Sequence, residues 1–380
     1  MAEFQLHTGD ALAVLKGLDS ESVQTCVTSP PYFGLRDYGI DGQLGLEASP
    51  ELYVERLVSI FREVKRVLRK DGTLWLNLGD SYAGSWGNYG GQNRGKGKQR
   101  EITNGSKAHQ KAYDGLEAWR PATSNKLDGI KSKELIGIPW MVAFALRSDG
   151  WYLRSEIIWH KPNPMPESVT DRPTKAHEQI FLLTKSPRYF YDLEAIKEPL
   201  KDASLARLGR GINDGHKNVE GAPGQTPHAL HQPRENVRGH ASGLEVPHAA
   251  NGQQRHGNQI KPPKFGGNNL CPDTRLQSGN EWNPEASGAN KKTVWTVATV
   301  GYREAHFATF PPELIKPCIL AGSREGDTVL DPFNGAGTTG LVALRHNRNY
   351  IGIELNPEYV EMSRRRLFND APLLNQERVA

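Results

Sequence analysis

Cysteine is scarce in this chain, which has three among its 380 residues, at Cys26, Cys271 and Cys318. The three are widely separated and form no Cys-x-x-Cys pair, so we expect neither a structural zinc site nor a disulfide framework. Free thiols of this kind suit a reducing compartment. The twelve histidines are scattered, with no His-x-x-x-His pair on a helix, so no metal site of another kind is expected.

Long apolar runs are also missing, and no segment is long enough to cross a bilayer. The first residues, MAEFQLHTGD, lack the basic-then-apolar pattern of a secretory signal. We therefore expect a cytoplasmic protein without a membrane partner.

Hydrophobic residues make up only 37% of the chain, which is below the usual share for a compact domain and indicates long loops or inserts. The formal net charge of +4 is too small to identify a nucleic-acid partner by itself. Its distribution is more informative, because basic residues gather at 84–133 and 201–265, where they would suit contact with phosphate. Solvated polar loops are the alternative interpretation.

The remaining segments alternate between strand and helix patterns. Short β-branched and apolar runs predict strands at 22–28, 73–78, 151–159, 328–331 and 350–354, and a hairpin of 178–184 with 188–191. Apolar residues at helical spacing predict helices at 51–69, 139–147, 312–320, 335–345 and 357–367. This alternation is typical of an α/β fold with a parallel sheet and helices on both faces. Core positions are expected for Trp75, Trp140 and Trp151.

Composition divides the chain into three parts. Residues 1–198 form one ordered part, interrupted by a basic loop at 83–133, and residues 300–380 form another. Between them, residues 199–299 are rich in Gly, Pro, His, Asn and Gln and hold little apolar material for a core of their own. We expect this segment to be a substrate-reading insert, because binding residues concentrate on loops that a rigid scaffold positions.

A glycine-rich loop, Asp331-Pro-Phe-Asn-Gly-Ala-Gly-Thr-Thr339, joins the strand at 328–331 to the next helix. Gly335 and Gly337 would let a ligand approach the backbone closely. The loop should lie at the carboxyl end of the sheet, where open α/β folds bind ligands. Glu354 ends the following strand, at about the 20-residue spacing expected of an acid that binds ribose hydroxyls.

This loop is not a Walker loop, because no Gly-Lys-Thr follows it. An aspartate at its start would repel phosphate and would suit a ligand with positive charge, such as a methionyl ammonium or a sulfonium. The alternative is a glycine turn that only packs a helix on the sheet. The combination of acid, glycine loop and second acid favours the ligand site.

A second motif, Ser29-Pro30-Pro31-Tyr32, also follows a buried strand. Its prolines stiffen the turn and remove two N–H donors, which leaves hydrogen-bond acceptors in excess. The Ser29 oxygen and the Pro30 carbonyl can accept hydrogen bonds from an amine, and Tyr32 can stack on a flat ring. Phe33 fits the core and a base pocket equally well.

The chemistry of an exocyclic base amine explains why such acceptors would be useful. The amine is a poor nucleophile because its lone pair is conjugated with the ring. Acceptors for its N–H groups would favour a pyramidal nitrogen, so positioning and polarisation could supply much of the catalysis without a metal. A target base in a duplex would first have to be flipped out. Taken alone, the tetrapeptide is more often a packing turn; the glycine loop in the same chain favours function.

With these two motifs in this order, the chain resembles the β group of the N4-cytosine/N6-adenine DNA methyltransferases of bacterial and phage modification systems. Trp159-His-Lys-Pro-Asn163 and His306-Phe-Ala-Thr-Phe-Pro311 also resemble family motifs. The resemblance covers the ordered segments and not the two inserts. It implies a Rossmann-like class I S-adenosylmethionine-dependent methyltransferase sheet of seven strands, circularly permuted, with a target-recognition region inserted at 199–299.

The resemblance further implies which residues bind the cofactor S-adenosylmethionine. Glu354 would bind the ribose hydroxyls and Asp10 the adenine, while Thr309 and Pro311 would cover the methionine portion. The full implied cofactor set is Asp10, Thr309, Pro311, Asp331, Phe333, Asn334, Gly335, Gly337, Thr338 and Glu354. The implied catalytic set is Ser29, Pro30, Pro31 and Tyr32.

Adenine enzymes of this group more often carry Asp or Asn before Pro-Pro-Tyr, so Ser29 favours the N4 amine of cytosine in double-stranded DNA, with the N6 amine of adenine as the alternative. Methylation at C5 would need a cysteine nucleophile, and Cys26 lies inside the strand. An RNA methyltransferase and an inactive DNA-binding subunit are weaker alternatives, and the order of the motifs disfavours a glutamine methyltransferase acting on proteins. Two partners are left open: a restriction endonuclease that acts on the same DNA site, and a second copy of this chain in a homodimer.

Overall fold

The computed structural model of the protein describes residues 2–35, 39–40, 42–83, 129–200, 288–299, 310–371 and 376–378. The chain divides into two units, one formed by residues 1–198 and 289–380 and the other by residues 199–288. Every helix and strand described below lies in the first unit. Thr309, most of the basic loop and most of the 199–299 insert lie outside the described residues.

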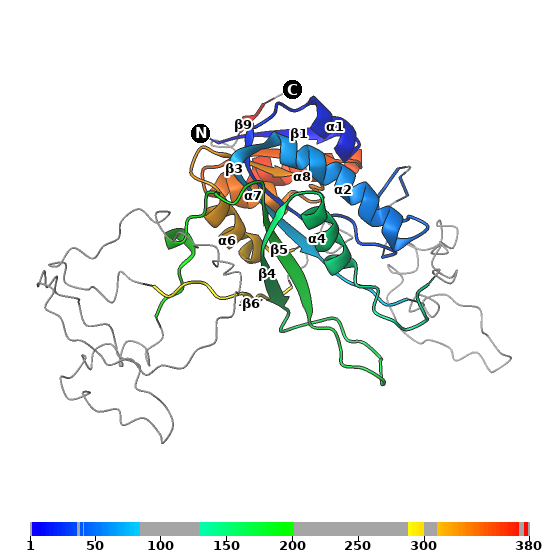
Figure 1. Ribbon diagram of the computed structural model, residues 1–380. Coiled ribbons are helices and arrows are strands. Elements are labelled where there is room, and N and C mark those ends of the chain that lie inside the picture. The colour runs from blue at the N-terminus through cyan, green and yellow to red at the C-terminus, as the bar shows by residue number, and fades with distance from the viewer. Residues whose placement is uncertain are drawn as a thin grey trace, which may run out of the picture. The chain divides into compact units, whose positions relative to one another are not determined.

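The described residues form one sheet (Figure 1), which has nine strands where the resemblance implied seven, in the order β6-β4-β5-β3-β2-β7-β8-β1-β9. The strands are β1 (Glu3–Thr8), β2 (Val23–Thr28), β3 (Leu68–Leu78), β4 (Tyr152–His160), β5 (His177–Thr184), β6 (Val294–Thr296), β7 (Thr328–Asp331), β8 (Asn349–Glu354) and β9 (Gln376–Glu377). β5 runs antiparallel to both of its neighbours, and the other pairs are parallel. The two shortest strands, β6 and β9, lie at the edges.

The order of strands in the sheet differs sharply from their order in the chain. β7 and β8 lie between β2 and β1, with Thr25 opposite Val329 and Leu6 opposite Gly352. From β7 the chain therefore continues to one side through β8, and from β2 to the other side through β3. The carboxyl ends of β2 and β7 flank this switch point, which is where open α/β sheets form a ligand crevice.

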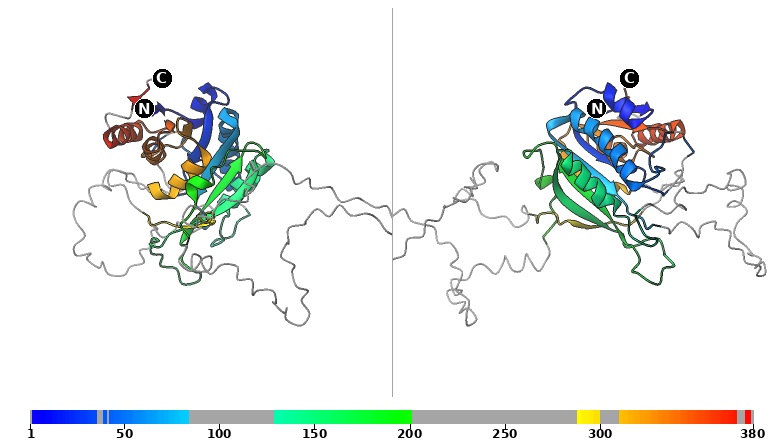
Figure 2. Two further views of the ribbon diagram at one scale, coloured as in Figure 1. Left: turned by 90° about the vertical axis from the view of Figure 1, so that its left-hand side faces the viewer. Right: turned by 45° about the vertical axis from the view of Figure 1, so that its right-hand side comes forward.

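Two layers of helices cover the faces of the sheet. One layer contains α1 (Ala11–Gly17), α2 (Pro50–Val67) and α4 (Ile138–Ser148), and the other contains α6 (Pro312–Gly322), α7 (Thr338–Arg345) and α8 (Pro357–Asp370). Figure 2 shows these layers on opposite sides of the strands, with the blue and green helices across from the brown and red ones. Each layer buries its own apolar cluster against the sheet.

Helix α2 illustrates why these residues adopt these elements. Ser49 caps its first turn by accepting a hydrogen bond from the Leu52 N–H, and Pro50 occupies a position where no intrahelical N–H is needed. Its apolar stripe is fully buried, including Leu57, Phe61 and Val64. Burial of each such side chain contributes about 1.5–3 kcal/mol, so the stripe holds the helix on the sheet.

All expected helices are present, with ends that differ by a few residues, and so is every expected strand except 188–191. That hairpin prediction was wrong, because β3 and β4 already occupy both edges of β5; the true hairpin is β4 with β5. Trp75 and Trp151 are buried as expected, whereas Trp140 near the start of α4 is 36% exposed. Several further elements were not expected: β1, α1, β6, β9 and a short 3-10 helix at Glu194–Ile196.

The packing of α7 on β8 leads to a stability prediction. A Cβ at Gly340 would lie 2.6 Å from the buried Tyr350 ring, so Gly340→Ala should lower the free energy of unfolding by about 1–3 kcal/mol through overpacking. Gly17→Ala is the matched control, because nothing lies within 4 Å of its Cβ. Urea denaturation would measure both variants, and equal stability of the two would contradict this packing.

Candidate functional site

A cavity of about 540 Å³ opens at the carboxyl ends of the central strands. It lies within the size range of small-molecule sites, roughly 300–1,000 Å³. Its wall combines residues from both ends of the chain, including Ser29 and Tyr32 after β2 and Gly335 and Glu354 after β7 and β8. The strand order brings the two motifs to one site, although β2 ends at residue 28 and β7 begins at residue 328.

The Ser29–Tyr32 turn lines this cavity with all four of its residues. The Tyr53 hydroxyl donates to the Pro31 carbonyl at 2.8 Å, so that acceptor is already engaged. No described residue donates a hydrogen bond to the Pro30 carbonyl or to the Ser29 hydroxyl oxygen. The turn therefore presents two acceptors that are available to a ligand.

Asp331 is buried, with 1% exposure, and does not line the cavity. Its carboxylate accepts hydrogen bonds from the Thr28 hydroxyl at 2.6 Å, the Thr339 hydroxyl at 2.7 Å and the Phe333 N–H at 3.0 Å. Burial raises the pKa of this carboxyl to about 6, although the three donors oppose the rise. The side chain thus joins the residue before Ser29 to the first turn of the glycine loop.

The glycine loop contributes Phe333, Asn334, Gly335 and Thr338 to the cavity wall. Gly335 has φ 52°, a conformation that favours glycine, and its N–H donates to Glu354 Oε2 at 2.8 Å. Gly337 lies off the cavity, and its positive φ and the closeness of Ser363 leave no room for a side chain. Pro311, the N-cap of α6, does not line the cavity either.

Two carboxylates belong to this part of the cavity. Glu354 ends β8, and its Oε1 accepts the Asn356 N–H at 2.9 Å; burial raises the pKa of this carboxyl. Asp10 follows β1 and caps α1 by accepting the Ala13 N–H at 2.9 Å. A backbone hydrogen bond from Gly9 to Glu354 joins the two segments. Each carboxylate can accept further hydrogen bonds from hydroxyl or amine donors.

Three polar side chains beside Tyr32 were not expected from the sequence. The Tyr32 hydroxyl lies 2.8 Å from Glu178 Oε2 and 3.2 Å from Asn77 Oδ1, and Lys161 forms an ion pair with Glu178. Asn77 could have been noticed as a polar residue near the end of a buried strand. Glu178 gave no such signal, because it lies at the beginning of β5, and only the antiparallel direction of β5 brings that end to the cavity.

Phe33 belongs to the apolar core, with 2% exposure and its ring 5.7 Å from that of Tyr53. This placement resolves the two interpretations of the sequence in favour of packing.

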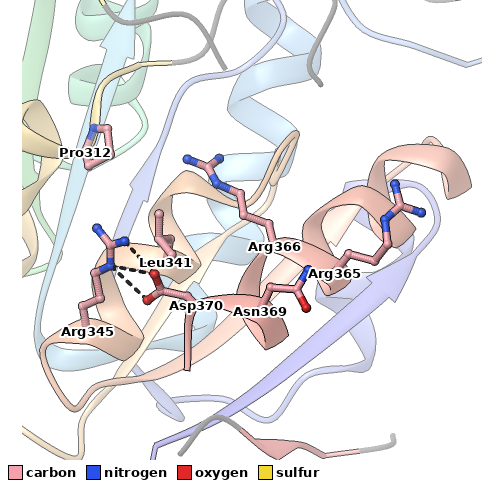
Figure 3. Close-up of a pocket in the computed structure, with 7 residues that line it drawn as sticks. All are labelled: Pro312, Leu341, Arg345, Arg365, Arg366, Asn369 and Asp370. Carbon is pink, nitrogen blue, oxygen red and sulfur yellow. Dashed lines mark hydrogen bonds and ion pairs between the residues drawn. The ribbon is translucent and has the colours of Figure 1, made fainter. Parts of the chain in front are cut away.

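A second hollow lies between α7 and α8 (Figure 3). There the Arg345 guanidinium pairs with the Asp370 carboxylate, and Arg366 donates to the Ala336 carbonyl and the Thr338 hydroxyl. None of the expected site residues that the structure describes borders this hollow, although Pro312, the residue after Pro311, does. Of the arginines that line this hollow, Arg366 thereby contacts the glycine loop.

Among the described residues, no group of three His, Cys, Asp or Glu side chains could hold a metal ion. No helix in that part of the chain combines the length and the apolar composition needed to span a membrane.

Comparison with known proteins gives consistent matches. The chain matches the N6_N4_Mtase family model, described as DNA methylase, over residues 23–365. It is 43% identical to the type II methyltransferase M.Cfr9I of Citrobacter freundii, over 95% of this chain and 87% of that protein. It is 38% identical to the type II methyltransferase M.SmaI of Serratia marcescens, over 96% of this chain and 90% of that protein.

Solved structures share the fold at low sequence identity. The cytosine-N4-specific PvuII DNA methyltransferase has a TM-score of 0.52 at 16% identity, over 96% of this chain and 86% of that one. TTHA0409 from Thermus thermophilus, in complex with S-adenosyl-L-methionine, has a TM-score of 0.51 at 19% identity, over all of both chains. These neighbours confirm the expected methyltransferase sheet.

The buried Asp331 leads to a prediction about pH. Its pKa of about 6 lies above the usual 3.8, so the folded state holds the proton more tightly than the unfolded state. This group's contribution to stability is therefore fully present below about pH 4 and is lost as the pH rises through 6, on the order of 3 kcal/mol in all. Asp331→Asn should lack that contribution.

Urea denaturation of both proteins at pH 4.5 and pH 7.5 would measure the effect. The stability of the unsubstituted protein relative to Asp331→Asn should fall between the two pH values, and the other acids cancel in this difference. A difference that does not change with pH would contradict the prediction.

Proposed function

This chain belongs to the N6_N4_Mtase family of DNA methylases, and we propose that it methylates the N4 amine of cytosine in duplex DNA. Membership makes it a DNA methyltransferase that depends on S-adenosylmethionine and acts on an exocyclic amine, at N4 of cytosine or N6 of adenine. The cofactor supplies the methyl group from a sulfonium that is already a good electrophile. The protein therefore has to bind the cofactor and the target base, orient them and polarise the amine.

The observation that carries the proposal is the meeting of two motifs in one cavity. The Ser29–Tyr32 turn and the glycine loop line the same wall, and Asp331 connects them through Thr28 and the Phe333 N–H. A methyl donor bound by the glycine loop would then lie next to an amine bound by the Ser29–Tyr32 turn. Such positioning is worth several kcal/mol of the barrier.

The cavity also fits the cofactor chemically. Glu354 keeps oxygen lone pairs for the ribose hydroxyls beyond its bonds to Gly335 and Asn356. We assign Asp10 to the adenine portion and Phe333, Asn334, Gly335 and Thr338 to the methionine portion, because all five line the cavity. We assign Asp331 and Gly337 to the support of the loop. A cover over the methionine portion, which the resemblance implies for Thr309 and Pro311, stays a prediction, because Thr309 lies outside the described residues and Pro311 does not line the cavity.

The two available acceptors match the two N–H donors of a base amine. Tyr53 already engages the Pro31 carbonyl, so the Ser29 oxygen and the Pro30 carbonyl are left for the amine. Hydrogen bonds to both would favour a pyramidal nitrogen whose lone pair faces the methyl donor. Tyr32 provides the flat surface on which the flipped base stacks.

The choice of cytosine rests on Ser29, since a serine before Pro-Pro-Tyr is typical of N4-cytosine enzymes. The fold neighbour PvuII DNA methyltransferase, named as cytosine-N4-specific, is consistent with this choice. The second candidate is N6 of adenine, favoured by a 41% identity to the DNA adenine methyltransferase YhdJ of Escherichia coli over 27% of this chain.

We further propose that residues 199–299 read the target sequence and that duplex DNA is the partner. The relatives given above are type II methyltransferases, so we extend the proposal to a restriction endonuclease that recognises the same site. The end of the proposed insert adjoins the sheet, because β6 pairs with β4 through Trp295 and Trp159.

Nucleoside analysis tests the function directly. Purified protein, unmethylated genomic DNA and S-adenosylmethionine should yield N4-methyl-2′-deoxycytidine on digestion and mass spectrometry. N6-methyl-2′-deoxyadenosine would instead establish the second candidate. Neither product, together with no calorimetric binding of S-adenosylmethionine, would overturn the proposal.

Removing one acceptor should separate binding from chemistry. Ser29→Ala is expected to lower the methylation rate by about 10²-fold, by analogy with the loss of one positioned hydrogen bond in other active sites. Calorimetry should find S-adenosylmethionine bound as tightly as before. The control is Ser59→Ala on the exposed side of α2, where the hydroxyl only donates to Glu55; full activity in Ser29→Ala would contradict the assigned role.

A further inference from the structure

We infer that Glu178 is a positioning residue for methyl transfer, which acts through the Tyr32 hydroxyl to keep Ser29 a hydrogen-bond acceptor. This inference rests on the proposed function. It concerns a residue outside the Ser29–Tyr32 turn, on β5, which is separated from β2 by β3 alone. The directions of the Tyr32 and Ser29 hydroxyl protons decide whether the Ser29 oxygen can accept a hydrogen bond from an amine.

The Glu178 carboxylate is surrounded by donors. Lys161 forms an ion pair with its Oε1, and the Asn77 amide donates to its Oε2 at 3.2 Å. The Lys161 and Glu178 side chains are only 18% and 14% exposed, so both charges are largely removed from water and stabilise each other. Lys161 can only donate hydrogen bonds and a carboxylate can only accept them, so Lys161 is the donor and Glu178 the acceptor.

The Tyr32 hydroxyl has one proton, and Glu178 determines its direction. The two oxygens lie 2.8 Å apart, shorter than the 3.2 Å to the Asn77 oxygen, and a bond to a carboxylate is the stronger kind. Burial and the negative charge of Glu178 raise the pKa of Tyr32 well above its usual value, so the phenol keeps this proton. The Tyr32 oxygen is then free to accept.

Ser29 is the next member of the chain of hydrogen bonds. Its hydroxyl lies 3.3 Å from the Tyr32 oxygen and donates to it. With its only proton directed at Tyr32, the Ser29 oxygen presents lone pairs to the cavity. A target amine offers N–H donors, so this orientation of the serine is the one that can receive it.

The position of the Tyr32 ring does not depend on its hydroxyl alone. The ring packs against Gly79, where a Cβ would lie only 2.5 Å from the ring edge. Tyr32→Phe should therefore keep the ring in place and remove only the hydroxyl. The variant therefore tests the hydrogen bonds of the Tyr32 hydroxyl without changing the ring surface on which a base would stack.

Glu178→Gln is a sharp probe because Lys161 can only donate. The ammonium would hold the glutamine oxygen at the place of Oε1, and the Asn77 amide, which donates to Oε2, would lose that acceptor. The new NH2 group would then face Tyr32 and donate to it. The tyrosine proton would have to turn away from Glu178, toward Asn77 or Ser29, and the serine would lose its fixed orientation.

The experiment compares Tyr32→Phe, Glu178→Gln and the double variant in single-turnover methylation of unmethylated genomic DNA at saturating S-adenosylmethionine. Each single variant should lose about tenfold in rate, the effect of one hydrogen bond, and the double variant should be no slower than the slower single one. Calorimetric affinity for S-adenosylmethionine should not change in any of them. Glu198→Gln is the control, because its ion pair with Lys291 lies outside the cavity wall.

A full rate in Glu178→Gln would overturn the inference. So would losses that multiply in the double variant, since Glu178 would then act by a route other than Tyr32. Loss of cofactor binding in Glu178→Gln would also overturn it, because the effect would be structural. These outcomes differ from failure of the proposed function, in which the unsubstituted protein itself would methylate no DNA.

Discussion

The hydrogen bond from Thr28 to the buried Asp331 carboxylate connects residues that are 303 positions apart in the chain. Thr28 directly precedes Ser29, and Asp331 begins the glycine loop, so this contact sets how the two motifs meet. A buried carboxylate is costly unless donors surround it, and here two threonine hydroxyls and one backbone N–H satisfy it. The rest of the site depends on this junction between β2 and β7.

Around that junction, the site controls which acceptors face the cavity. The Tyr53 hydroxyl donates to the Pro31 carbonyl, and the Ser29 hydroxyl donates to the Tyr32 oxygen. Among the described residues, no donor then reaches the Pro30 carbonyl or the Ser29 oxygen, so both can accept hydrogen bonds from a ligand. A methyltransferase acting on an amine needs this excess of acceptors, since its substrate brings only donors at the reacting nitrogen. Under the proposed function, the polar side chains beside Tyr32 would serve the chemistry by orienting these acceptors.

The fold and the motifs could largely be predicted from the sequence. Local periodicity predicted every α-helix except α1 and most of the strands, because a buried stripe or a short β-branched run is a property of neighbouring residues. The sequence also predicted that the Ser29–Tyr32 turn and Glu354 would lie at the carboxyl end of the sheet, where both line one cavity. The wrong hairpin at 188–191 and the exposed Trp140 arose where the outcome depends on a partner strand or a neighbouring element.

Residue types and their spacing determined which atoms of this protein can accept a hydrogen bond and where a ligand can approach the backbone. Only the tertiary structure decided that Asp331 lies buried at the junction and that Glu178 reaches Tyr32. Both outcomes depend on strand pairing between distant parts of the chain, and for Glu178 on the antiparallel direction of β5. Such pairing is set by the packing of the whole sheet, which no local pattern of residues encodes.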